Sequence, residues 1–256
     1  MSGMLLRLAG PLQSWGEHAA FNVRDTLAFP TRSGLIGMFA AARGQSRHTA
    51  LQAYDALSFT IRVDRPGRIL GDFHTVGGGQ SNRNQTLPLG GGGRRPMDTA
   101  TLVTRRQYLT DAVFTVAVEA PDTLIGELAT ALDHPVWALY LGRRSCPPTE
   151  PLVLRRVTDD PVHELLHRAP LTPERPPNPT DQHVTATFYW DRAPSSQDTD
   201  PTPTYEVSDV PESFAPRSRR YRTRPVWRTE ESLDAGLCAG PDPMDALVFY
   251  AEGTHA

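Results

Sequence analysis

The stretch that decides the fold is Leu5-Leu-Arg-Leu-Ala-Gly-Pro-Leu-Gln-Ser-Trp-Gly16, which is followed by Arg24 and by Phe29-Pro-Thr-Arg-Ser-Gly-Leu-Ile-Gly37. A short apolar strand breaks at Gly10-Pro11 and leads into a polar and aromatic loop. A second loop leads into a small-residue helix, whose free N–H groups are expected beside Arg32. Because helix-start N–H groups and guanidinium groups both bind anions, this layout suits an anionic backbone.

Hydrophobic periodicity predicts an alternation of strands and helices. Strands are expected at residues 4–8, 57–63, 112–118 and 138–141, and helices at residues 33–43 and 123–132. Ser33 is expected to cap the first helix, and Gly44 to end it. The order β-α-β-β-α-β is typical of a ferredoxin-like or RRM-type sheet, so the expected fold class is α+β.

One connection of this predicted sheet is unusually long. It runs from about Phe73 to Tyr108 and carries Gly77-Gly-Gly79 and Gly90-Gly-Gly-Gly93 around a polar tip. Such a segment cannot pack a core of its own. One interpretation is an idle mobile loop; we favour a long protruding hairpin, at residues 73–108, whose arginines meet a partner. These arginines are Arg83, Arg94, Arg95, Arg105 and Arg106.

The sequence changes character after Pro147. Fourteen of the 24 prolines lie between Pro147 and Pro216, and the Asp-, Thr- and Ser-rich stretch from Pro170 to Pro203 is expected to be irregular or disordered. Residues 183–190 are predicted to form an isolated strand within it. We therefore expect a domain at residues 1–149 and a C-terminal extension at residues 150–256.

Composition limits the kinds of partner. The formal net charge is −3, so any nucleic-acid surface must come from a local arrangement of charges. All 26 basic residues are Arg; coding bias is the plain explanation, and the functional one is that guanidinium groups suit phosphates and base stacking. Cys146 and Cys238 form no disulfide framework and no paired metal spacing, which favours a reducing cytoplasm. No apolar run approaches the roughly 18 residues of a membrane span, so we expect a soluble protein with no membrane partner.

Further blocks follow the opening stretch in a characteristic order. They are Asp72-Phe-His-Thr75, Arg106-Gln-Tyr108, Asp111-Ala-Val-Phe-Thr-Val116 and Tyr140-Leu-Gly-Arg-Arg-Ser-Cys-Pro147. Together these blocks resemble the Cas-five family of CRISPR-associated proteins, in the RAMP superfamily, in the form found in type I-E Cascade complexes. The resemblance spans about residues 4–150, and the last block is its most specific part.

The resemblance implies a non-catalytic subunit without a cofactor or metal, which caps the 5′ handle of the guide RNA (crRNA) in antiviral defence. The implied partners are the crRNA, the backbone and large subunits of Cascade and, through the complex, target DNA. The long hairpin would be a thumb that touches the guide RNA and the neighbouring backbone subunit. Together with an RRM-type platform and the turn at residues 141–146, it would clamp a splayed single strand. The expected RNA-binding residues are Gln13, Ser14, Trp15, Gly16, Arg24, Thr31, Arg32, Ser33, His74, Thr75, Arg105, Arg106, Tyr108, Leu141, Gly142, Arg143, Arg144, Ser145 and Cys146.

Plainer interpretations stay open for several of these residues. The first loop is either a turn with a core tryptophan or a place where Trp15 stacks near a base. Residues 31–33 either cap a helix only or also hold a phosphate together with Arg32. Adjacent arginines point in different directions, so one of Arg143 and Arg144 is expected to face RNA and the other to brace the fold.

Two other motifs have a plain and a functional interpretation. The run from Arg217 to Arg228 interleaves six arginines with two aromatic residues, as in either a solvated face or a nucleic-acid or subunit contact. His163-Glu-Leu-Leu-His167 spells the zincin motif. Pro161 and Pro170 limit its helix to about two turns and no third ligand follows, so we expect a surface helix without metal.

The alternative function is a metal-independent endoribonuclease that processes the crRNA precursor. Such cleavage needs a base, an acid and an oxyanion stabiliser near a 2′-hydroxyl group. His74, Tyr108 and an arginine are the candidates for these roles. Because Arg stays protonated it is a poor proton donor, which favours binding without cleavage.

Overall fold

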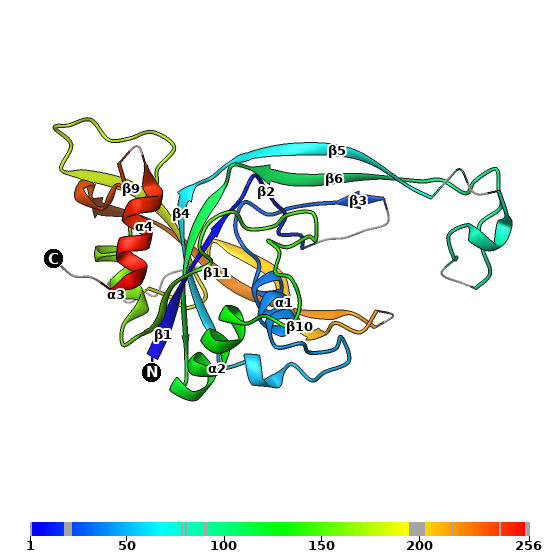
Figure 1. Ribbon diagram of the computed structural model, residues 1–256, viewed down its shortest axis with the longest axis horizontal. Helices are drawn as coiled ribbons and strands as arrows, with labels where there is room; N and C mark the ends of the chain where they lie inside the picture. Colours follow the sequence, from blue (N-terminus) through cyan, green and yellow to red (C-terminus); the bar gives the residue numbers. More distant parts are fainter. Residues whose placement is uncertain are drawn as a thin grey trace.

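The computed structural model describes residues 2–17, 22–77, 79, 81–89, 92–194, 203–216, 218–240 and 242–253. They form a mixed α+β fold around a large, curled antiparallel sheet (Figure 1). Its seven strands run in the order β10-β11-β9-β4-β7-β1-β8. Their bounds are β1 Ser2–Ala9, β4 Ser58–Arg65, β7 Val113–Ala120, β8 Val153–Thr158, β9 His183–Trp190, β10 Tyr205–Ser213 and β11 Arg220–Asp234.

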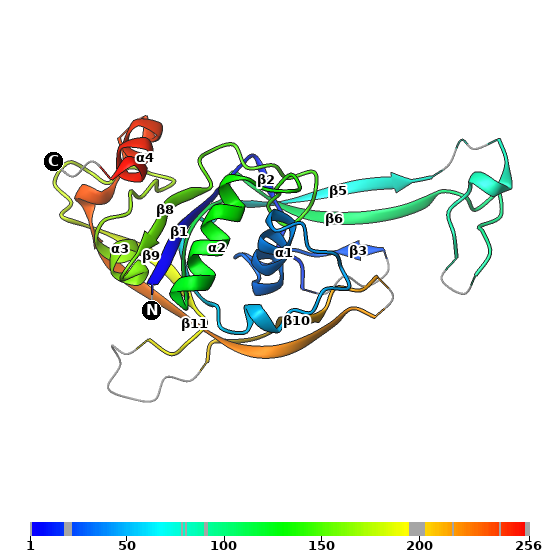
Figure 2. The same ribbon diagram turned by 60° about the horizontal axis from the view of Figure 1, so that its bottom comes forward.

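Helices cover both faces of the central strands β1 and β7. α1 (Arg32–Ala42) and α2 (Asp122–Asp133) pack with Met4, Leu6 and Leu8 in one core cluster. α3 (Pro161–His167) and α4 (Pro243–Glu252) pack with Leu5 on the opposite face (Figures 1 and 2). Successive side chains of a strand point to opposite faces, so β1 is buried along its whole length.

The face under α3 holds a buried ion network. The Arg62 guanidinium donates to both carboxylate oxygens of Asp64, at 2.7 and 3.3 Å, and Arg7 reaches Asp64 Oδ2 at 3.2 Å. Arg62 also donates to the carbonyls of Leu165, Ala169 and Pro170. Buried charges need such partners, so this network holds the segment after α3 on the sheet.

A smaller sheet extends from the body as a long two-stranded arm (Figure 2). In it, β5 (Arg68–Val76) and β6 (Leu102–Thr110) pair antiparallel from Arg68↔Thr110 to Val76↔Leu102. The short strands β2 (Leu12–Gln13) and β3 (Val23–Arg24) pair with the body end of β6. Of the predicted glycine hinges, 78 and 90–91 lie outside the described residues, as do 195–202 of the predicted irregular stretch.

Most predicted elements form within two residues of their expected ends, with three corrections. The cap of α1 is Thr31, whose Oγ1 accepts the Gly34 N–H, and not Ser33. Residues 138–141 form no strand, because Val136 and Trp137 just before them bond to the end of α1 and Leu141 N then donates to Cys146 O in a turn. The strand at 183–190 is not isolated, since β9 lies between β11 and β4. Strands from both sides of residue 150 share one sheet, and the two-part division stays a prediction.

The zincin-like motif forms α3, and its glutamate is used in packing. The Glu164 carboxylate accepts hydrogen bonds from Tyr250 Oη at 2.5 Å and Arg168 Nη1 at 3.0 Å. Burial and the Glu164 contact raise the pKa of Tyr250. Within the described ranges, no cluster of three or more His, Cys, Asp or Glu is placed to hold a metal, and no helix is long and apolar enough to cross a bilayer.

Replacing Arg62 with Met should lower the free energy of unfolding by about 3–5 kcal/mol, because Asp64 loses one of its two cationic partners and three carbonyls lose a donor. Denaturant unfolding measures this change. The control is Arg68→Met, which removes an exposed ion pair with Glu174 and should change little. Equal stabilities of the two variants would contradict the role given to the buried network.

Candidate functional site

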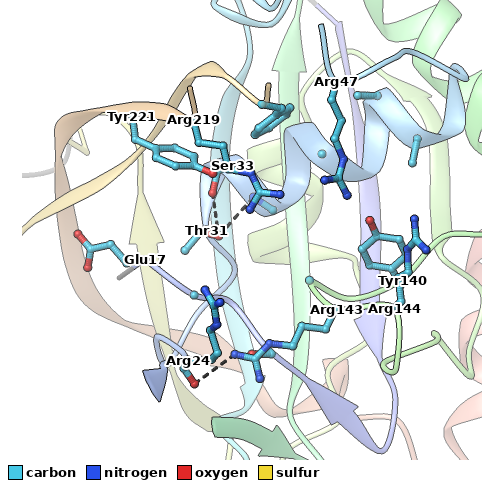
Figure 3. A pocket seen from close by; sticks show the side chains of 18 of the residues that line it. Glu17, Arg24, Thr31, Ser33, Arg47, Tyr140, Arg143, Arg144, Arg219 and Tyr221 are labelled. Carbon is cyan, nitrogen blue, oxygen red and sulfur yellow. Dashed lines mark hydrogen bonds between the residues drawn. The ribbon is translucent and has the colours of Figure 1, made fainter. Parts of the chain in front are cut away.

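A cleft of about 620 Å³ lies beside α1, between the loop at residues 137–144 and the β10–β11 hairpin (Figure 3). Small residues of α1 form its floor, and arginines and aromatic residues from separate segments form its walls. The cleft therefore combines positive charge with flat apolar surfaces. Its charged and aromatic lining residues are Glu17, Arg24, Asp25, Arg47, Trp137, Tyr140, Arg143, Arg144, Phe214, Arg219 and Tyr221.

The loop before Gly16 supports the cleft from below. Trp15 is only 1% exposed and packs under α1, where a Cβ added to Gly34 would lie 2.8 Å from its ring. Its Nε1 donates to Gln13 Oε1, and Gln13 Nε2 donates to the carbonyls of Leu8 and Ala112. This corrects the expectation that Trp15 stacks on a base and Gln13 contacts RNA, because both side chains are in the core.

A carboxylate of the protein itself, that of Asp209, occupies the N-terminus of α1. The Arg32 N–H donates to Asp209 Oδ2 at 2.6 Å, and the Arg32 side chain donates to Asp191 Oδ2 at 2.8 Å. Arg224 completes the cluster, with hydrogen bonds of 2.6 Å to both Asp191 Oδ1 and Asp209 Oδ1. The predicted phosphate site at this helix start is therefore corrected: a carboxylate already satisfies the N–H, and Arg32 is buried in an ion pair.

The turn at residues 141–146 forms a wall of the cleft, and it depends on one glycine. Gly142 has φ +85°, and a Cβ there would lie 1.8 Å from Ser14 O. The turn closes through a Leu141 N–H to Cys146 O bond of 2.7 Å, and Ser14 N donates to Leu141 O at 3.1 Å. Leu141 and Cys146 are fully buried, and burial raises the pKa of the Cys146 thiol. Their side chains thus hold the turn in place and face away from the cleft's solvent.

The two adjacent arginines have different roles. Arg143 donates to the carbonyls of Gln107, Arg24 and Asp25 at 3.0 to 3.2 Å, and its guanidinium lies 4.9 Å from the ring centre of Tyr108. Arg144 is exposed. Arg143 is therefore the one that braces the fold, and Arg144 is the one that is open to a ligand.

Arg144 belongs to a set of three exposed arginines around the cleft. The others are Arg47, beyond the end of α1, and Arg219, at the start of the β11 side of the hairpin (Figure 3). In the part of the chain that the structure describes, no carboxylate lies within ion-pair distance of these three. The acid Glu17 also lines the cleft, where its Oε1 accepts the Ser208 N–H at 2.6 Å. Unpaired guanidinium groups at a cleft are ready to bind anions.

The predicted RNA-binding residues divide into groups. Those lining the cleft are Ser14, Gly16, Arg24, Thr31, Ser33, Gly142, Arg143 and Arg144. Those on the arm are His74, Thr75, Arg105 and Arg106. Those buried away from the cleft are Gln13, Trp15, Arg32, Tyr108, Leu141 and Cys146, and Ser145 is exposed outside the cleft. Ser14 and Thr31, at the cleft, are also nearly fully buried.

Sequence reasoning did not single out Arg47, Trp137 or Tyr140 as RNA-binding residues, although Tyr140 opens the last family block. It noticed the run that holds Arg219 and Tyr221, which line the cleft, and left its role open. The rest of this run has other uses: Arg224 joins the buried cluster, Arg222 pairs with Glu212 at 3.2 Å, and 217 lies outside the described residues.

His74 and Tyr108, the candidate residues for RNA cleavage, do not lie next to each other on the arm. Tyr108 pairs with Leu70 across the arm, and His74 pairs with Thr104. His74 is therefore four residues farther along the arm, a separation of about 13 Å at the rise of a strand. Tyr108 is also buried under Arg143.

Comparison with known proteins agrees with this architecture. Residues 3–227 match the family described as CRISPR-associated protein (Cas_Cas5). The chain belongs to this family. This Cas_Cas5 chain is 38% identical over 185 residues to the CRISPR system Cascade subunit CasD of Escherichia coli (strain K12), an alignment that covers 66% of the chain and 78% of the relative.

Two solved structures are also similar to this Cas_Cas5 chain. A chain of a structure named "CRISPR RNA-guided surveillance complex" matches with a TM-score of 0.86 and 46% identity, covering 98% of this chain and 99% of that one. A second structure, named "Crystal structure of Cas protein", matches with a TM-score of 0.62 and 28% identity over 94% of this chain and 99% of that chain.

Replacing Arg143 with Ala should lower the free energy of unfolding by about 1–3 kcal/mol, because partly buried carbonyls lose their donors. Arg144→Ala is the matched control and should leave stability within about 0.5 kcal/mol. Thermal and denaturant unfolding measure both. The division of roles between these neighbours is wrong if Arg144→Ala is the more destabilising change.

Proposed function

We propose that this chain is a non-catalytic, crRNA-binding subunit of a type I-E CRISPR Cascade surveillance complex, in which it caps the 5′ handle of the guide RNA during antiviral defence. The similarity to CasD and to a chain of an RNA-guided surveillance complex supports the assignment to Cascade. The observation that carries RNA binding is the cleft, where Arg47, Arg144 and Arg219 are exposed among aromatic residues and form no ion pair with any carboxylate of the described residues.

The chemistry of the cleft favours single-stranded RNA. Guanidinium groups neutralise phosphates, and aromatic rings stack on unpaired bases, a combination that is common in single-strand binding. The chain as a whole has a net charge of −3, so its overall field does not attract RNA. The local positive charge of the cleft must therefore supply the attraction.

The proposed grip differs from that of an open RRM platform. The elements β1, α1, β4, β7, α2 and β8 follow the β-α-β-β-α-β order, which supports a ferredoxin-like core. In RRM domains RNA lies on the sheet face opposite the helices. Here α3 and α4 cover that face. We therefore place the RNA in the cleft beside α1.

The arm is the proposed thumb, for contact with the guide RNA and the neighbouring backbone subunit. Ile69 and Phe73, 67% and 66% exposed, lie on the same face of β5 because they are four residues apart. Exposed apolar side chains of this kind mark surfaces that a partner covers. We also expect the chain, once it is assembled into Cascade, to contact the large subunit and, through the complex, target DNA.

Replacing Arg47, Arg144 and Arg219 together with Ala should weaken binding of labelled single-stranded CRISPR-repeat RNA. The slope of affinity against salt should fall by about 0.7 for each phosphate contact that is lost. Fluorescence anisotropy in EDTA at several salt concentrations measures both quantities. The control replaces Arg156, Arg175 and Arg192, which are exposed outside the cleft and change the net charge equally.

If the triple variant at Arg47, Arg144 and Arg219 has unchanged affinity and an unchanged salt slope, the RNA-binding proposal is wrong. The same incubations test catalysis, because a defined cut in the RNA would favour the endoribonuclease instead.

Replacing Ile69 and Phe73 with Ser should leave stability and RNA affinity nearly unchanged, because both side chains are mostly exposed. Incorporation into Cascade should fall, since the partner loses an apolar contact. Co-purification with the other subunits measures it. The control carries the same change at Val157 and Phe249, which are also exposed. Normal assembly of the arm variant would refute the thumb.

A further inference from the structure

The floor of the cleft is bare helix backbone. Gly37, in the middle of α1, lines the cleft, and a Cβ added to it would meet no atom of the described residues within 4 Å. Ala40 and Ala41 continue this floor. Gly34 differs, because the Trp15 ring leaves no room for a Cβ there. Glycine in a helix interior lowers helix stability by about 1 kcal/mol relative to Ala. At Gly37 this loss is not required by packing.

The walls of the cleft face each other across this floor. Tyr140 and Arg144 lie together at one end of the cleft, Tyr221 and Arg219 lie at the other, and Arg47 lies between the two pairs (Figure 3). The volume of about 620 Å³ is within the range of small-ligand sites and is large enough for a base with its sugar and phosphate. A ligand here meets a flat floor, two aromatic walls and positive charge at the rim.

A phosphate alone does not account for this shape. The anion-binding start of α1 is already taken by Asp209, so the open region lies farther along the helix. Phosphate oxygens need N–H donors, whereas a bare floor offers contact area to a planar ring.

From these observations we propose that one unpaired nucleobase of the bound RNA is inserted into the cleft against the Gly37 surface of α1, between Tyr140 and Tyr221. Arg47, Arg144 and Arg219 meet the phosphates on either side of the inserted base. The inference rests on the proposed RNA-binding function and specifies how this site holds the RNA. Single-stranded RNA permits it, because unpaired bases are free to leave the stack.

Gly37→Met tests the insertion, because the new side chain fills the cleft without a clash at Cβ. Gly126→Met is the matched control: Gly126 is also inside a helix with open space around its Cβ, but it does not line the cleft. Both variants should be at least as stable as the parent in thermal unfolding. Anisotropy with labelled single-stranded CRISPR-repeat RNA should show a loss of about tenfold or more for Gly37→Met, the size of one lost stacked base, and no loss for Gly126→Met.

An abasic scan of the same RNA identifies the base. In the parent protein, removing one particular base should weaken binding by about tenfold, and the Gly37→Met variant should be insensitive at that position. This coupling distinguishes insertion of a base from general damage to the protein.

Three other outcomes overturn the inference. If the parent binds the RNA and Gly37→Met binds it equally well, insertion is wrong while the proposed function stands. If Gly37→Met binds RNA normally but no longer co-purifies with Cascade, the cleft holds a partner's side chain. If the parent protein binds no RNA, both the insertion and the proposed function fail.

Discussion

The buried cluster of Arg32, Asp191, Arg224 and Asp209 joins three parts of the chain that shape the cleft. Arg32 begins α1, Asp191 follows β9, and Asp209 and Arg224 belong to the β10–β11 hairpin. Each charge is buried, so each depends on the others, and removing one partner leaves an uncompensated charge. This mutual dependence fastens the hairpin to the start of α1. It thereby places one wall of the cleft at a defined distance from its floor.

The opposite wall is fixed by hydrogen bonds to backbone. Arg143 bonds to carbonyls on β6 and around β3, and Gly142 lets the turn approach Ser14 more closely than any other residue permits. Arg32, which is buried, and Arg143, which is half-buried at the edge of the cleft, thus use their side chains to build the site. The arginines left over at the rim are the ones free to bind a ligand, which explains how a chain with negative net charge presents a positive cleft.

Local patterns were sufficient for many elements. Alternating apolar residues predicted β4 and β7, helical periodicity predicted α2, and residues 183–190 matched β9 end to end. The strand expected at 138–141 failed because the two residues before it bond to α1 and Leu141 bonds within its own turn, and no local pattern reports those partners. The capping error at α1 has a similar origin. Thr31 and Ser33 both have the hydroxyl that a cap requires, and the position of the helix start decided between them.

The sequence by itself determined the family blocks, the order of the main strands and helices, and the presence of many arginines, because these depend on neighbours along the chain. Only the tertiary structure decided which arginines are buried and which are exposed. The partners that decide it are remote: Arg32 meets Asp209 at a separation of 177 residues, and Arg143 meets Arg24 at 119. Burial removes water from a charge and makes a partner necessary, and that partner is supplied by folding rather than by sequence neighbours.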